Sequence, residues 1–172
     1  AGHTYAGGGD MEQVEFRPTG FLGIDWALDQ GAYKIKRIVR PAAWDNEVRS
    51  PFDRPGIDVK AGDYIFSVNG ITIDRARDPY AAFEGLAGRV VSLRIGKTAN
   101  AAEAKEVIVE TLNPQQEGRL RHLEWIESNR KAVDLASNGN LGYMYMPNTT
   151  TQGQTELLRQ FYAQVDKKGF VI

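Results

Sequence analysis

The clearest pattern in this chain is the run Ile57-Asp58-Val59-Lys60-Ala61-Gly62-Asp63-Tyr64-Ile65-Phe66-Ser67-Val68-Asn69-Gly70-Ile71-Thr72-Ile73. It reads as a turn, an alternating strand, a second turn and the start of another strand. Gly62-Asp63 supplies a polar tight turn, and Asn69-Gly70 supplies the left-handed backbone that a two-residue reversal requires. Ile65 and Val68 take buried strand positions. The run therefore predicts two strands joined by an Asn-Gly turn.

Segments on either side of this run complete a recognisable order. Upstream, Gly20-Phe21-Leu22-Gly23-Ile24 contains small residues that let successive backbone N–H groups converge on an anion. Strands are predicted at Ala32 to Arg40 and Arg89 to Ile95, and a short helix at Asp78 to Leu86. Any β-rich domain can contain the two turns, but this order of segments resembles a PDZ domain. The resemblance implies a carboxylate-binding loop and a helix that walls a peptide groove.

The composition of the 172 residues narrows the class of protein. The chain can hold one large domain, or one small domain with attached pieces. Lysine plus arginine (21) nearly cancels aspartate plus glutamate (22), so no whole-chain field favours nucleic acid or an anionic membrane. The absence of cysteine excludes disulfides, thiolate zinc sites and a cysteine nucleophile within this chain, and it fits a cytoplasmic protein. We expect no metal and no cofactor.

In the second half of the chain the pattern predicts alternating helices and strands. The predicted elements are a strand at Glu106 to Leu112, a long helix at Pro114 to Ala136, a strand at Leu141 to Pro147, a helix at Gln154 to Asp166 and a strand at Phe170 to Ile172. Helix, strand, helix and strand predict the first crossover of a parallel sheet. Charged residues of the long helix, among them Glu117, Arg121 and Glu127, are expected on its outer face.

These patterns predict a mixed α/β protein. A small PDZ-like β-barrel with two helices is followed by the start of an α/β subdomain. The expected division is a glycine-rich end at 1–13, the PDZ-like domain at 14–113 and the truncated subdomain at 114–172. A weak strand at Val14 to Arg17 and a helical turn at Ala42 to Val48 are also predicted. Both ends of the sequence read as cuts through a larger protein.

Motifs outside the PDZ-like domain carry a second resemblance. They are Gly2-His3-Thr4-Tyr5, Gly7-Gly8-Gly9-Asp10, Leu141-Gly142-Tyr143, Met146-Pro147-Asn148-Thr149 and Lys168-Gly169-Phe170-Val171-Ile172. In this order around a PDZ domain they resemble the carboxyl-terminal part of the tricorn proteases. The resemblance implies a large cytoplasmic serine peptidase, related to the carboxyl-terminal processing peptidases, that degrades peptides and assembles as a homo-oligomer.

The same resemblance implies one catalytic residue in this chain. His3 matches the family's catalytic histidine, the general base toward a serine hydroxyl. Gly2 stands where the family has a serine in the hydrogen-bonded relay, so that detail does not carry over. The nucleophilic serine and the acidic residue are expected outside this sequence, and the chain alone is therefore expected to be inactive. His122, inside the long helix, is expected to be a surface or packing residue.

The PDZ resemblance implies a peptide site. An added strand would pair with Ile24 to Leu28, and its terminal carboxylate would rest on the loop amides. The expected peptide-binding residues are Phe21, Leu22, Gly23, Ile24, Tyr80, Phe83 and Leu86. Two alternatives remain open: the groove serves as an internal docking surface of the parent enzyme, or the chain is a stand-alone adaptor that binds peptide carboxyl termini.

Overall fold

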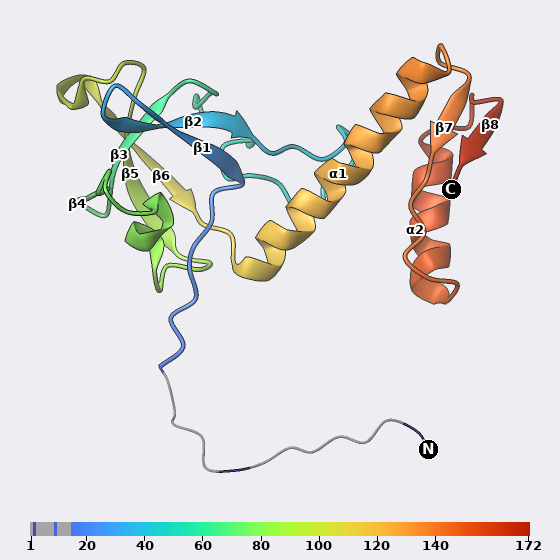
Figure 1. The fold of residues 1–172 in the computed structure, drawn as a ribbon, viewed down its shortest axis with the longest axis horizontal. Coiled ribbons are helices and arrows are strands. Elements are labelled where there is room, and N and C mark those ends of the chain that lie inside the picture. The colour runs from blue at the N-terminus through green and yellow to red at the C-terminus, as the bar shows by residue number, and fades with distance from the viewer. Residues whose placement is uncertain (1, 3–8, 10–14) are drawn as a thin grey trace.

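The computed structural model describes residues 2, 9 and 15–172. Figure 1 shows an antiparallel sheet with its loops, a long helix leading away from it, and a small α/β unit at the far end of that helix. The elements of the first part are β1 (Ile24–Asp29), β2 (Ala32–Ile38), β3 (Tyr64–Val68), β4 (Ile71–Thr72), the 3-10 helix η1 (Pro79–Phe83), β5 (Val90–Gly96), the 3-10 helix η2 (Ala101–Glu103) and β6 (Lys105–Glu110).

The sheet has the order β1-β2-β3-β5-β6, and β4 pairs with β3. All of these pairings are antiparallel, and β1 and β6 lie at the two ends of the order. The mixed α/β class is confirmed, but the sheet is open and does not close into the small barrel that the sequence suggested. β1 is therefore an edge strand, the position that strand addition requires.

The Asn-Gly turn and the strand before it are confirmed. Asn69 and Gly70 have φ angles of 49° and 80°, and the turn joins β3 to β4 with Val68 opposite Ile71. Ile65 and Val68 are fully buried in the core of the sheet. Leu22 and Ile24 from residues 20–24 and Phe83 from η1 are buried in the same hydrophobic core as the strand residues. The loop and η1 therefore share one core with the sheet.

Three predicted segments of the first part differ from the structure, and in the second part the strand predicted at Leu141 to Pro147 ends at Tyr143. No strand forms at residues 15–17. Residues 42–48 form turns, because the Asp45 carboxylate accepts a hydrogen bond from the Glu47 N–H, a local bond that competes with helix. The predicted helix at 78–86 is reduced to η1: the Asp78 side chain caps it, and Gly85 with φ +73° turns the chain soon after its end.

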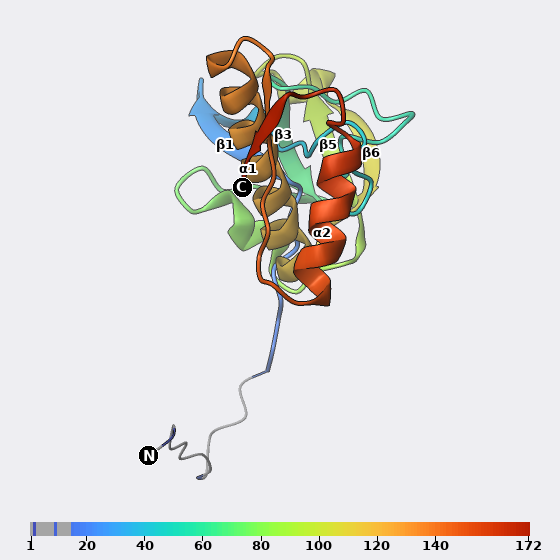
Figure 2. The same ribbon diagram turned by 90° about the vertical axis from the view of Figure 1, so that its right-hand side faces the viewer.

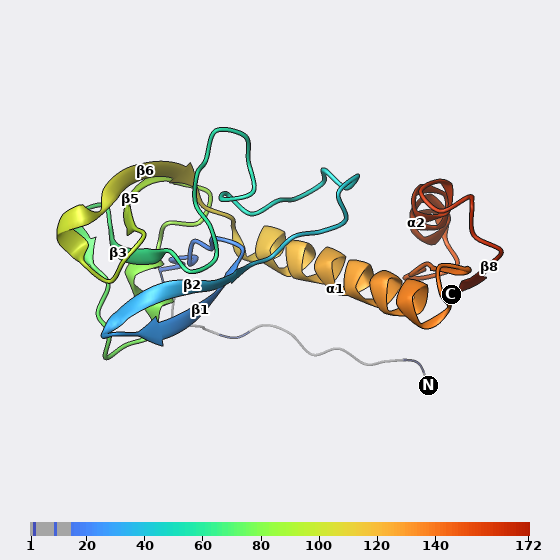
Figure 3. The ribbon, with the colours of Figure 1, turned by 90° about the horizontal axis from the view of Figure 1, so that it is seen from above.

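The long helix α1 (Pro114–Ala136) has the predicted bounds. Asn113 and Gln116 form a reciprocal capping box at its start, and Pro114 occupies the first turn. Asn138 and Gly139, both with positive φ, end it. Seen from above in Figure 3, α1 runs from the end of β6 towards α2. None of the described helices is long and apolar enough to cross a membrane.

The α/β unit consists of β7 (Leu141–Tyr143), α2 (Thr151–Tyr162) and β8 (Gly169–Val171), and it faces the viewer in Figure 2. The predicted parallel pairing of β7 with β8 is confirmed. The helix α2 begins and ends earlier than predicted. Its start is fixed by the Asn148 side chain, which accepts hydrogen bonds from backbone N–H groups there. Buried Gln160 and Gln164 each donate to and accept from the backbone next to β7.

Charged side chains tie this unit to the loop before β3. We name as the ion-pair relay the five residues Asp45, Glu47, Arg119, Glu156 and Arg159. Arg119 on α1 lies 2.7 Å from Glu47 and 2.8 Å from Glu156, and Arg159 on α2 lies 2.7 Å from Glu156 and 2.8 Å from Asp45. Asp45 is only 3% exposed. The relay therefore connects a loop of the PDZ-like part with both long helices.

We expect the relay to make stability depend on acid. The hydrogen bond from Arg119 holds the pKa of Glu47 below its ordinary value. Burial alone would raise the pKa of Glu156, but the hydrogen bonds from Arg159 and Arg119 outweigh it and lower that pKa. A carboxyl group whose pKa is lowered on folding stabilises the protein above its ordinary pKa of 4.5, and this stabilisation is lost as the pH falls through the folded value.

The free energy of unfolding should therefore fall between about pH 4.5 and the lowered folded pKa values. Urea titrations at a series of pH values would measure it. Glu156→Gln should flatten the pH dependence, because it removes one of the titrating groups. The exposed Glu84→Gln is the matched control. An unchanged acid profile in Glu156→Gln would show that the relay does not carry the effect.

Candidate functional site at the carboxylate loop

The loop at residues 20–24 is held closely on both sides. The Gly20 N–H donates to the Phe83 carbonyl at 2.9 Å, and a Cβ at Gly20 would lie 2.7 Å from the Leu86 carbonyl oxygen. Gly23 has φ +62°, and a Cβ there would lie 2.7 Å from Leu120 Cδ2. Glycine at both positions therefore allows the loop to pass between η1 and α1.

Ser50 fixes the loop from the opposite side. Its Oγ donates to the Leu22 carbonyl at 2.7 Å and accepts from the Phe52 N–H at 3.2 Å. Ser50, Leu22 and Ile24 are each 0% exposed. The loop is thus preorganised by buried contacts, and its side chains are part of the core.

A carboxylate of the chain itself occupies this loop. The Gly23 N–H donates to Glu117 Oε2 at 3.0 Å, across 94 positions of sequence. Glu117 Oε1 accepts from Arg121 Nε at 2.7 Å. Burial raises the pKa of Glu117, and Arg121 and the Gly23 amide oppose that rise only in part. The expectation that Glu117 and Glu127 lie on an outer face is wrong, since each is 6% exposed. The helix α1 packs Glu117 against the loop, and Glu127 is buried beside Arg130, 2.6 Å away.

Arg121 covers the edge of β1 beside the loop. Its guanidinium donates to the Ile24 carbonyl at 2.9 Å and to Asp25 Oδ1 at 2.8 Å. Asp25 also accepts from Arg37 at 2.8 Å. Burial alone would raise the pKa of Asp25, but the hydrogen bonds from Arg121 and Arg37 outweigh it and lower that pKa. Asp25 is therefore an ionised partner of two arginines.

The expected second wall of the groove is aromatic. Tyr80 lies between Phe21 and Trp26, with ring centroids 4.8 and 5.7 Å away, and 6.0 Å from Phe83. Phe83 is fully buried, and burial raises the pKa of Tyr80. The Trp26 Nε1 is buried without a hydrogen bond of good geometry among the described residues, and its closeness to Tyr80 opposes the rise in the pKa of that residue. This wall is therefore a packed aromatic cluster.

The structure brings together the residues predicted for the peptide site. Phe21, Leu22, Gly23, Ile24, Tyr80, Phe83 and Leu86 lie in or against the core formed by the loop, β1 and η1. Sequence reasoning missed Ser50, Glu117 and Arg121, the residues that hold the loop. The spacing of Glu117 and Arg121 by four positions, on one face of α1 with Leu120 between them, was the only local signal. His3 lies outside the described residues.

His122 is a packing residue of α1. His122 packs against Trp125 and Tyr145, with ring centroids 5.7 and 4.9 Å away, as expected for a packing residue. Within residues 2, 9 and 15–172, no group of three histidine, aspartate or glutamate side chains is placed to hold a metal ion.

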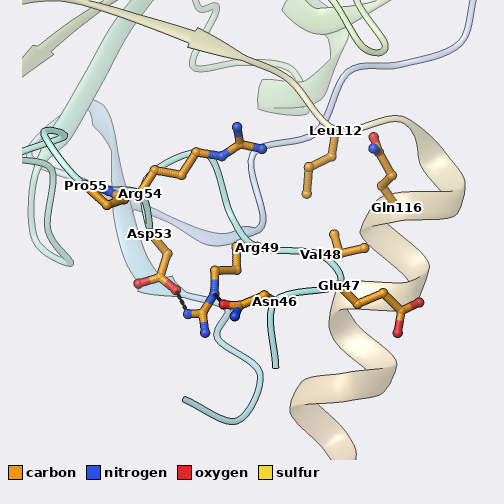
Figure 4. A pocket seen from close by; sticks show the side chains of 9 residues that line it. All are labelled: Asn46, Glu47, Val48, Arg49, Asp53, Arg54, Pro55, Leu112 and Gln116. Carbon is orange, nitrogen blue, oxygen red and sulfur yellow. Dashed lines mark hydrogen bonds and ion pairs between the residues drawn. The ribbon is translucent and has the colours of Figure 1, made fainter. Parts of the chain in front are cut away.

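A polar hollow of about 450 Å³ is lined by residues 46–49 and 53–55 together with Leu112 and Gln116 (Figure 4). Its charged lining residues balance, with Glu47 and Asp53 opposite in sign to Arg49 and Arg54. Arg49 is paired with Asp53 at 2.8 Å, and Glu47 belongs to the ion-pair relay. The balance of charge gives this hollow no preference for an anion or a cation.

A family model described as the tricorn protease PDZ domain matches residues 20–114, more than half of the chain. The chain belongs to this family. The matched segment begins at the carboxylate loop and ends at the first residue of α1. Glu117 and Arg121, which contact the loop of this tricorn-type PDZ domain, therefore lie just beyond it in sequence.

Similarity to known proteins extends over the rest of the chain. The tricorn protease of Thermoplasma volcanium is 27% identical over 170 residues, which are 99% of this chain and 16% of that protein. Tricorn protease homolog 1 of Streptomyces coelicolor is 30% identical over 154 residues, which are 89% of this chain and 14% of that protein. The chain thus spans about a sixth of the length of these curated relatives.

The fold agrees with a solved structure. A crystal structure of the tricorn protease superposes with a TM-score of 0.70 at 23% identity, covering 84% of this chain and 14% of that one. This agreement confirms the fold of the open sheet and the elements that follow it.

Proposed function

We propose that this chain is a section of a tricorn-like serine peptidase that degrades peptides. The observation that carries the proposal is the similarity to a tricorn protease over 99% of the chain, on both sides of the PDZ domain. Similarity in a docking module alone would not extend to the flanking segments. In the proposal the parent protein is a cytoplasmic homo-oligomer, its partners are peptide substrates, and the division at residues 13/14 and 113/114 separates the PDZ domain from two catalytic subdomains.

His3 is the proposed general base. It would accept the proton of a serine hydroxyl as that oxygen attacks the peptide carbonyl, and would return the proton to the leaving amine. The serine and the acidic residue would come from parts of the parent outside these 172 residues. Gly2 has no side chain with which to continue a hydrogen-bonded relay, so His3 would need another partner to orient it.

The stand-alone adaptor is the weaker proposal. An adaptor needs an accessible carboxylate loop and a free strand edge. Here Glu117 occupies the loop amide of Gly23, and Arg121 occupies the Ile24 carbonyl. This contact supports the internal docking alternative, in which the PDZ domain fixes the position of α1 and the subdomain that follows.

The peptidase proposal is tested with the parent enzyme and a fluorogenic peptide amide. His3→Ala should lower kcat by about 10²- to 10⁴-fold, the usual contribution of a general base, while KM changes little. His122→Gln is the matched control, because it removes the other histidine from a packing position. The 172-residue chain alone should show no turnover. Hydrolysis by the isolated chain, or an unimpaired His3→Ala parent, would refute the proposal.

A further inference from the structure

We propose that Glu117 is a built-in ligand of the PDZ carboxylate loop, and that the loop accepts the carboxyl terminus of a peptide only when Glu117 vacates it. The inference does not depend on the peptidase activity of the parent, since it concerns only the loop, β1 and α1. The Glu117 side chain and the carboxyl terminus of a peptide would compete for the loop with the same chemical group, a carboxylate.

Glu117 and Arg121 of α1 take two hydrogen-bonding positions that a bound peptide would use. A peptide that adds to a sheet edge offers backbone hydrogen bonds to the strand and, in PDZ-type recognition, a terminal carboxylate to the loop amides. Glu117 supplies the carboxylate, 3.0 Å from the Gly23 nitrogen. Arg121 supplies the donor, 2.9 Å from the Ile24 carbonyl oxygen. A strand could not make both bonds while these side chains hold their positions.

The helix that carries Glu117 is fixed by packing, so only side chains would need to move to free the loop. Leu120, between the two side chains in sequence, is 0% exposed and packs with Val39 and Leu112. The backbone of α1 is therefore fixed, and in the proposal the loop is vacated by rotation of the Glu117 and Arg121 side chains. Arg121 would keep its partner Asp25, 2.8 Å away, during such a rotation.

Binding of Glu117 to the loop of its own chain should weaken peptide binding, because a peptide can bind only to the fraction of molecules in which the loop is vacant. A tethered ligand acts at an effective concentration in the millimolar range or above, so it competes strongly with a free peptide of micromolar affinity. Apparent affinity falls by the fraction of molecules in the open state. Removing the Glu117 carboxylate should therefore raise the affinity for a peptide by about tenfold or more.

The test uses the whole 172-residue chain and three probes: a hexapeptide ending in a free leucine, the same peptide amidated, and sodium acetate. Backbone amide shifts of residues 22–28 report peptide binding. In Glu117→Ala the free peptide should bind at least about tenfold more tightly than in the unaltered chain, and the amidated peptide should not bind. Acetate should raise the Tm of Glu117→Ala above that in equal sodium chloride, since it refills the vacated position, and should leave the unaltered chain unchanged.

Glu124→Ala is the matched control. It removes a glutamate from the same helix whose carboxylate contacts Arg37 and Ser128 instead of the loop. It should bind peptide no better than the unaltered chain. Glu117→Gln serves as a second variant that keeps the side-chain size, and it should bind the free peptide more tightly than the unaltered chain does. Equal peptide affinity in all four proteins, or folded Glu117 variants that respond neither to peptide nor to acetate, would overturn the proposal.

Discussion

Gly23→Ala is expected to lower the free energy of unfolding by about 2–5 kcal/mol. Two costs add. The left-handed backbone, with φ +62°, costs a residue with a Cβ about 1–2 kcal/mol. The new methyl group would also lie 2.7 Å from Leu120 Cδ2 and 2.9 Å from Ser50 Cβ, and relieving such overpacking typically costs about 1–3 kcal/mol. Small domains are stable by only about 5–15 kcal/mol, so the effect is large.

Gly88→Ala separates the two costs. Gly88 has a nearly identical φ of +63°, but nothing lies within 4 Å of the position that the new methyl group would take. It should lose only the backbone cost of about 1–2 kcal/mol. Urea unfolding of both variants, with equal m-values, measures the difference. Equal losses in the two variants would mean that the loop is not clamped between α1 and the Ser50 segment.

Leu120→Ala is the second large effect, with an expected loss of about 2–5 kcal/mol. Leu120 is 0% exposed and forms, with Val39 and Leu112, the small core that joins α1 to the PDZ domain. Truncation loses the transfer free energy of the side chain and leaves a cavity against Gly23. The loss should appear in urea unfolding and should also disturb the amide resonance of Gly23, because α1 carries Glu117.

Leu135→Ala is the control on the same helix. Leu135 is 81% exposed, so its truncation should change the free energy of unfolding by no more than about 0.5 kcal/mol. If Leu120→Ala were as mild as Leu135→Ala, the contact between α1 and the loop would not be a source of stability. The built-in ligand would then lack the fixed backbone on which its position depends.

The local elements of this protein could be predicted from its sequence. Asn69-Gly70 turns the chain between β3 and β4, and Asn113-Pro114 starts α1 where the pattern predicts it. The loop and the aromatic residues Tyr80 and Phe83 lie against each other, and their role in binding a peptide stays a prediction. These features depend on backbone geometry and on short-range spacing, which neighbouring residues specify.

What occupies that site could not be predicted in the same way. Glu117 follows the carboxylate loop by 94 positions, and its spacing with Arg121 and Glu127 fits a solvated helix face as well as a buried one. The periodicity of the sequence shows which residues share a face of the helix. Which charged residue is buried depends on whether the tertiary structure places a partner beside it. The packing of Leu120 beside Gly23 brings the Glu117 carboxylate to the Gly23 N–H, which together with Arg121 compensates part of the cost of its burial.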